Sequence, residues 1–187
     1  MATDATTAAP LLPETLRDQI RAYIPRYPNK RAVTLPALHL VHEHFRCVPM
    51  GAMAEIAELL GITPAEVHDT MSFYGFFSQA PIGDVRVWIC RSISCGLRGG
   101  DDLIEYACRR LGVGSGQTTA DGKLTVEFAE CLGLCDFAPA ALADDGRVFG
   151  PLTEARVDTM IRELGGGRVQ PSGRPTPRAI EDRDFKI

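Results

Sequence analysis

Four cysteines in two short pairs are the residues of this 187-residue chain best suited to chemistry. Four residues separate Cys90 from Cys95, three separate Cys131 from Cys135, and 35 residues lie between the pairs. Thiolates are soft, anionic ligands that bind zinc or the irons of an iron–sulfur cluster. The pattern therefore predicts a sulfur-rich metal centre, and it points to electron transfer rather than to substrate chemistry.

Each cysteine pair is expected at the end of a strand in a small α/β domain over residues 83–165. The alternation of apolar residues over 84–90 predicts a strand that ends at Cys90, and Cys131 follows a second strand over 124–128. If these strands are parallel neighbours, the two loops meet at one end of the sheet. The remaining expected elements are helices over 100–111 and 154–164 and hairpins at 120–123 and 144–146.

The chain before this domain is expected to form a small helical bundle over residues 13–82. Apolar residues recur there at helical spacing between Pro and Gly stops. The four predicted helices begin at Glu14, near Thr34, at Met50 and at Thr63-Pro64. Residues 1–12 are predicted to be disordered, and residues 166–187 form a tail rich in Pro and Arg.

Composition excludes several classes of partner and location. The net charge of −4 and the pI near 5.6 argue against nucleic acid or an anionic membrane as the main partner. No uninterrupted apolar run approaches the roughly 18 residues that span a bilayer. The first ten residues lack the basic and apolar regions of a secretory signal, so a cytoplasmic location is expected. Structural disulfides are disfavoured in that compartment.

Two alternatives to an iron–sulfur cluster stay open at this point. Structural zinc sites usually have two residues between paired cysteines, and both spacings here are wider. A thiol–disulfide enzyme of the thioredoxin type needs a Cys-x-x-Cys motif at a helix N-terminus, which this sequence does not contain. Both alternatives are disfavoured by spacing without being excluded.

The other metal-binding residue types favour structural interpretations. Cys108 shares a helical stripe with apolar residues and is expected in the core, and Cys47 is expected to be inert. The histidines at 39, 42 and 44 have no acidic or cysteine partner in a recognised ligand pattern. A glycine-rich stretch at 112–116 follows a helix instead of linking a strand to one, so no dinucleotide site is expected.

Several longer motifs give the chain a family resemblance. Around the cysteines stand Cys90-Arg-Ser-Ile-Ser-Cys95-Gly-Leu-Arg-Gly-Gly, Glu130-Cys131-Leu-Gly-Leu-Cys135 and Ala138-Pro139. The helical half contributes Pro36-Ala-Leu-His39, Thr63-Pro-Ala-Glu-Val67 and Ser72-Phe-Tyr74. On these motifs, residues 14–165 resemble the 24-kDa subunit family of respiratory complex I, the NADH:quinone oxidoreductase of bacteria.

This resemblance implies a fold and a cofactor. The fold class would be mixed α and β (α+β or α/β), a small N-terminal helical bundle followed by a thioredoxin-like [2Fe–2S] ferredoxin domain. Cys90, Cys95, Cys131 and Cys135 would hold one [2Fe–2S] cluster, with one pair on each iron.

The resemblance also implies partners and a place in an enzyme. The chain would be a subunit of an NADH dehydrogenase (quinone) complex, with no catalytic residue of its own. It would exchange single electrons with the FMN of an adjacent flavoprotein subunit that also binds NADH, and it would neighbour the large iron–sulfur subunit. It would lie in the peripheral arm of a complex attached to the inner membrane, on the cytoplasmic side and without inserting into the bilayer. The equivalent subunit of an NAD-dependent formate dehydrogenase or hydrogenase is the alternative.

Overall fold

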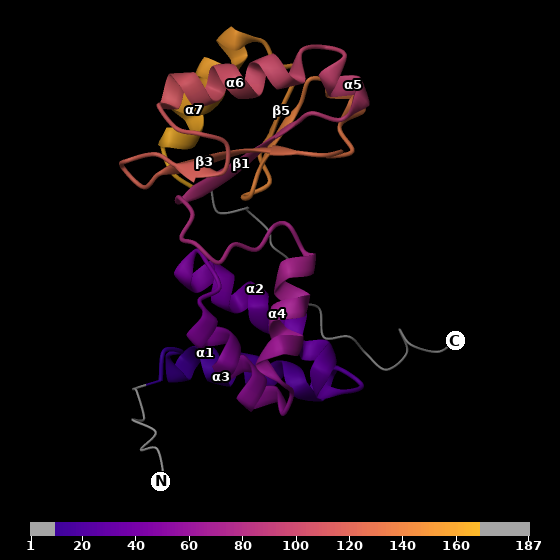
Figure 1. The fold of residues 1–187 in the computed structure, drawn as a ribbon, viewed down its shortest axis with the longest axis vertical. Helices are drawn as coiled ribbons and strands as arrows, with labels where there is room; N and C mark the ends of the chain where they lie inside the picture. The colour runs from indigo at the N-terminus through magenta and orange to yellow at the C-terminus, as the bar shows by residue number, and fades with distance from the viewer. Residues whose placement is uncertain (1–9, 169–187) are drawn as a thin grey trace, which may run out of the picture. The chain divides into compact units, whose positions relative to one another are not determined.

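The chain divides into two compact units, with the division between Pro81 and Ile82 (Figure 1). The computed structural model describes residues 10–168. Each unit has its own hydrophobic core, so each is described by itself.

The first unit is helical, and its helices begin where the sequence predicts. Its elements are α1 (Glu14–Tyr23), the 3₁₀ turns η1 (Ile24–Arg26) and η2 (Lys30–Val33), α2 (Thr34–Phe45), α3 (Met50–Leu60) and α4 (Pro64–Phe73). The start of α4 shows the local cause most clearly. Thr63 and Glu66 form a capping box, which satisfies backbone N–H groups that the first helical turn leaves without partners.

The helices of the first unit bury their apolar stripes against one another. Leu16 and Ile20 contribute from α1, Leu38 from α2, and Met53 and Ile56 from α3, each with 5% or less of its surface exposed. Burial of such side chains supplies most of the stability of short helices, which are marginal alone.

The start of the described chain differs from the prediction that residues 1–12 are disordered. Leu12 is only 2% exposed and belongs to the helical core. The backbone N–H groups of Leu11 and Leu12 donate hydrogen bonds to the carboxylate of Glu55 on α3, and Arg17 donates to the same carboxylate at 2.7 Å. Because one buried apolar residue and one anion fix this segment, residues 10–12 belong to the helical unit. Residues 1–9 lie outside the described part of the chain.

The second unit is a five-stranded mixed sheet with helices on one face (Figure 1). The sheet order is β2-β3-β1-β4-β5, and β1 pairs with β3 in parallel while the other pairs are antiparallel. The strands are β1 (Val85–Cys90), β2 (Gln117–Thr118), β3 (Leu124–Ala129), β4 (Ala141–Ala143) and β5 (Val148–Phe149). The other elements are α5 (Ile93–Gly96), α6 (Gly100–Leu111), η3 (Cys135–Phe137) and α7 (Glu154–Gly165).

The alternation of apolar residues along β1 explains why the helices pack against one face of the sheet. Val85, Val87 and Ile89 point to one face and are buried in a core that α6 and α7 complete. The two helices pack against each other on this face. The predicted strands, hairpins and helices of this unit are therefore confirmed, and so is the mixed α and β fold class.

The structure describes three residues beyond the end of α7. Of the predicted tail, only residues 166–168 are described, where Arg168 lies 3.8 Å from the carboxylate of Asp144. The remaining tail lies outside the described residues.

Within residues 10–168, no helix has the length and apolar character needed to cross a membrane.

Glu55 gives a testable prediction for the helical unit. Burial raises the pKa of this carboxyl, but hydrogen bonds from Arg17 and from two backbone N–H groups more than offset it, so the pKa lies below its usual value. We expect Glu55→Gln to lower the free energy of unfolding at neutral pH by about 1–3 kcal/mol, because hydrogen bonds to a charged group are lost.

The effect should depend on pH. A depressed folded pKa stabilises the fold fully above the unfolded pKa of about 4.3, and this contribution is lost as the pH falls through the folded value. Urea unfolding followed by circular dichroism, at neutral pH and below about pH 4, measures the difference. Glu58→Gln, on the exposed side of the same helix, is the matched control. A difference between wild type and Glu55→Gln that does not change with pH would contradict the assignment.

Candidate metal centre

The parallel pairing of β1 and β3 places both cysteine loops at one edge of the sheet. Cys90 is the last residue of β1 and lies opposite Ala129, the last residue of β3, two residues before Cys131. The backbone N–H of Arg91 donates to the carbonyl of Ala129 at 2.9 Å, which continues the pairing one step beyond the strands. The two loops therefore leave the sheet side by side.

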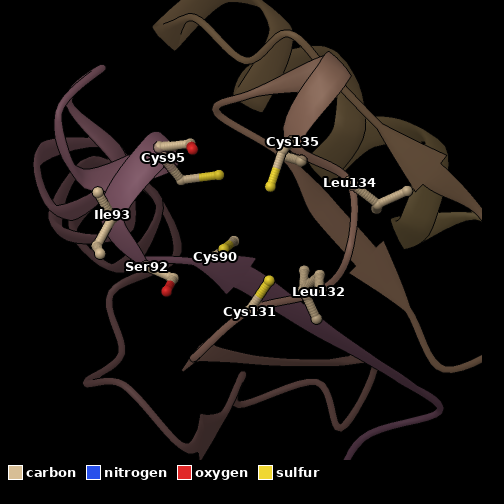
Figure 2. Close-up of a pocket in the computed structure, with 10 residues that line it drawn as sticks. Cys90, Ser92, Ile93, Cys95, Cys131, Leu132, Leu134 and Cys135 are labelled. Carbon is tan, nitrogen blue, oxygen red and sulfur yellow. The ribbon is translucent and has the colours of Figure 1, made fainter.

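The four thiols surround one pocket. Figure 2 shows the sulfur atoms of Cys90, Cys95, Cys131 and Cys135 directed toward the same space. The cavity has a volume of about 200 Å³. Its other lining residues are Ser92, Ile93, Ser94, Leu132, Leu134 and Ala140.

The two pairs differ in burial. Cys90 and Cys95 are buried, at 4% and 2% exposure, whereas Cys131 and Cys135 are exposed. All four are free thiols. The first loop thus forms the inner wall of the pocket, and the second loop forms the side that reaches solvent.

Backbone groups hold three of these thiols. The Cys90 thiol donates to the carbonyl of Glu130 at 3.0 Å, and the N–H of Gly133 donates to the sulfur of Cys131 at 3.4 Å. Burial raises the pKa of the Cys95 thiol, against a lowering by a hydrogen bond from the backbone N–H of Ala140. Metal ligands must be deprotonated, so a bound metal would displace the proton from Cys95.

A buried glycine lets α6 begin against the first cysteine loop. A Cβ atom at Gly100 would lie 2.7 Å from the carbonyl oxygen of Cys90 and 2.9 Å from that of Cys95. Such contacts are too short for any side chain, and the atoms in the way belong to the backbone. Gly100 therefore fixes how closely the helix approaches the ends of the first pair.

Two arginines tie the loops together. Arg91 donates to the carboxylate of Glu130 at 2.8 Å, and Arg98 donates to the carbonyl of Ala138 at 3.0 Å. The pairing of Arg91 with Glu130 had no signal in the sequence, because the two residues are 39 positions apart.

The short helix α5 and the apolar lining were missed by the sequence interpretation. Four residues are too few for a helical period, so α5, which includes Cys95, gave no signal. Ile93 and Leu132 lie between paired cysteines, and that position was the available clue to their place in the pocket.

The other candidate ligands lie elsewhere. Cys47 is buried at 6% exposure, and Cys108 packs against the core of the second unit. His39 stacks on Phe76 with ring centroids 5.0 Å apart. Among residues 10–168, no three His, Cys, Asp or Glu side chains converge closely enough to hold a single ion.

Comparison with known protein families identifies one family whose model matches most of this chain. The family model described as "Thioredoxin-like [2Fe-2S] ferredoxin" matches residues 20–165. The chain belongs to this family. The match includes both units and all four cysteines of the pocket, and it confirms the predicted resemblance at the level of the family.

Two curated relatives are similar to this ferredoxin-family chain over most of their length. It is 34% identical over 150 residues to an NADH-quinone oxidoreductase subunit of Rhizobium meliloti, which covers 80% of this chain and 89% of the relative. It is 37% identical over 135 residues to an NADH-quinone oxidoreductase subunit of Pseudomonas aeruginosa, which covers 72% of this chain and 81% of that protein.

A solved structure of an NAD+-reducing [NiFe]-hydrogenase in the H2-reduced state is also similar. It matches with a TM-score of 0.62 and 31% identity over 76% of this chain. The matched region is only 24% of the hydrogenase chain, so this ferredoxin-family chain corresponds to about a quarter of that protein.

The pocket fits the cluster that the family name implies. Each iron of a four-cysteine [2Fe–2S] cluster takes two thiolates, and the pocket offers two thiols from each of two adjoining loops. The Gly133 N–H already donates to one sulfur, as expected where negative charge has to be offset. Donor type, donor number and their division between two loops all suit this group.

Gly100→Ala tests whether close packing of α6 shapes the pocket. We expect a loss of about 1–3 kcal/mol in the free energy of unfolding of the metal-free protein, as for other overpacked buried sites. Alkylation of Cys95 should become faster, because the backbone must move away from the new methyl group. Gly165→Ala is the control, since a Cβ there meets nothing within 4 Å. Equal behaviour of the two variants would contradict this role of Gly100.

Proposed function

We propose that this chain is the [2Fe–2S] electron-transfer subunit of an NADH:quinone oxidoreductase. The observation that carries the proposal is the pocket in which Cys90, Cys95, Cys131 and Cys135 face one another from two adjoining loops. The family match, and the curated relatives that are named as subunits of this enzyme, support it.

The four cysteines would be the ligands, with Cys90 and Cys95 on one iron and Cys131 and Cys135 on the other. When bound, such a cluster takes up and releases one electron at a time. The protein supplies thiolates, N–H donors and apolar lining residues, which are Ile93, Leu132 and Leu134. No residue of this chain would act as an acid, base or nucleophile.

The electron partner would be the FMN of an adjacent NADH-binding flavoprotein subunit. The large iron–sulfur subunit would be a further neighbour in the cytoplasmic peripheral arm of a complex attached to the inner membrane. The curated relatives support this placement through their printed names, which are those of subunits of NADH-quinone oxidoreductase.

A second candidate is the equivalent subunit of an NAD-linked hydrogenase or formate dehydrogenase. The similarity at a TM-score of 0.62 to an NAD+-reducing hydrogenase favours it. Purification of the native complex separates the two, because quinone reductase activity and hydrogenase or formate dehydrogenase activity belong to different assemblies.

Anaerobic purification tests the cofactor. We expect about two irons and two acid-labile sulfides per chain, and an EPR signal at low temperature that appears only after reduction with dithionite. Each Cys→Ser variant of the four ligands should lose or alter the signal. Cys108→Ser, outside the pocket, should retain it. Stoichiometric zinc without sulfide would instead support a structural zinc site, and a metal-free protein that reduces insulin disulfides would support a thiol–disulfide enzyme.

Two exposed apolar residues, Ile93 in the pocket lining and Leu97 one turn later, test where the flavoprotein subunit would bind. We call this pair the rim of the pocket. Ile93 and Leu97 lie one turn apart, joined by an i to i+4 backbone hydrogen bond, and are 80% and 85% exposed. Large apolar side chains in such positions are typical of interfaces. We expect Leu97→Asp to keep its iron and its EPR signal but to bind the flavoprotein subunit about tenfold or more weakly, because burial of one leucine contributes about 1.5–3 kcal/mol.

The control for this experiment is Val148→Asp on β5, where the valine is 48% exposed. It adds the same charge to the same unit. Binding measured by co-purification and by titration should be unchanged in this variant. Equal binding of Leu97→Asp and wild type would rule out this rim as the docking surface.

A further inference from the structure

Arg91 spans the gap between the two cysteine loops. It directly follows Cys90, and two of its N–H groups reach one oxygen of Glu130, at 3.1 and 2.8 Å. Glu130 directly precedes Cys131. The pair thus links the residue after the first proposed ligand to the residue before the third.

The guanidinium of Arg91 has a second contact that fixes its place. It lies over the ring of Phe128, 3.9 Å from the ring centroid, which is within the range of a cation–π interaction. Phe128 is on β3, two residues before Glu130. One side chain therefore contacts both the strand and the loop that carry the second cysteine pair.

A backbone contact runs beneath this side-chain bridge. The N–H of Arg91 donates to the carbonyl of Ala129 at 2.9 Å, a bond that metal binding leaves in place. The relative position of the two loops is thus set by this main-chain bond and by the Arg91 side chain. Exposed ion pairs contribute little to global stability, so the consequence should appear at the metal site rather than in the unfolding of the chain.

We propose that Arg91 is a positioning residue that holds the two ligand loops in register, and that its charge and the charge of Glu130 shift the reduction potential of the site in opposite directions. This inference rests on the proposed function. Reduction adds one electron to an already anionic site and exchanges no atom, so nearby fixed charges shift the equilibrium. The positive charge of Arg91 favours the reduced state, and the negative charge of Glu130 opposes it.

The two charges give opposite predictions. Arg91→Gln should shift the midpoint potential to more negative values, and Glu130→Gln should shift it to more positive values. The double variant should return close to wild type, because the charge removed is then zero in total. Redox titration with dithionite as the electron donor, followed by EPR at low temperature, measures the midpoint potential of the wild type, the two single variants and the double variant. The shifts should shrink at high salt, since both side chains are partly exposed, at 41% and 72%.

A second measurement tests the positioning role separately from charge. Arg91→Lys keeps the charge but loses the planar group that lies on Phe128 and donates twice to Glu130. We expect its potential to stay near wild type while iron passes to a chelator several-fold faster. Arg91→Gln should release iron at least as fast. Arg109→Gln, which removes an exposed arginine paired with Glu105 on α6, is the control and should change neither quantity.

The outcomes separate this inference from the proposed function. A wild-type protein without iron and sulfide would overturn the proposed function itself. A wild-type cluster whose potential and iron release are the same in Arg91→Gln, Glu130→Gln and the control would overturn only the role of Arg91. If Arg91→Lys folds by circular dichroism and keeps the wild-type potential but releases iron faster than Arg109→Gln, the positioning role is supported.

Discussion

The parallel pairing of β1 with β3 is the constraint on which the rest of the site depends. Parallel strands present their carboxyl ends at the same sheet edge, and a parallel connection needs a crossover, which α6 supplies. An antiparallel pairing of the same two strands would send the cysteine loops to opposite edges. The register then fixes the detail, because Cys90 and Ala129 are opposite each other and both loops start at the same level.

The pocket balances charge against exclusion of water. Four thiols line it together with apolar side chains, and burial raises the pKa of Cys95. In the metal-free protein burial therefore favours the protonated form of Cys95, and metal binding has to release that proton. The backbone donor at Gly133 and the Arg91–Glu130 pair lie on the second loop or bridge to it. The buried thiols lie on the first loop, the Gly133 donor lies on the second, and the Arg91–Glu130 pair joins the two loops.

Much of this arrangement could be predicted from the sequence, and the gaps have physical causes. Alternation in 84–90 and the capping box at Thr63 are local signals, and both elements formed as expected. The α5 helix was not predictable, because four residues with glycines after them carry no period. The burial of Leu12 was missed because it depends on Glu55, 43 residues later in the chain. The contacts of Arg91 were missed for the same reason, because its partners Phe128 and Glu130 follow 37 and 39 residues later in the chain. Such contacts form only once the helices of the first unit have packed, or once the sheet of the second unit has set its register.

The two units contribute unequally to the pocket, yet the region matched by the family spans both. Every residue that lines the pocket lies in the second unit, and the helical unit has a separate core. A free-standing electron carrier would need only the sheet unit. The family model nevertheless starts at residue 20, inside α1, and the curated relative from Rhizobium meliloti aligns over 80% of the chain. Because α1 to α4 supply no group to the pocket, the chemistry of the pocket does not account for their place in the matched region, and the family is defined by more than its four cysteines.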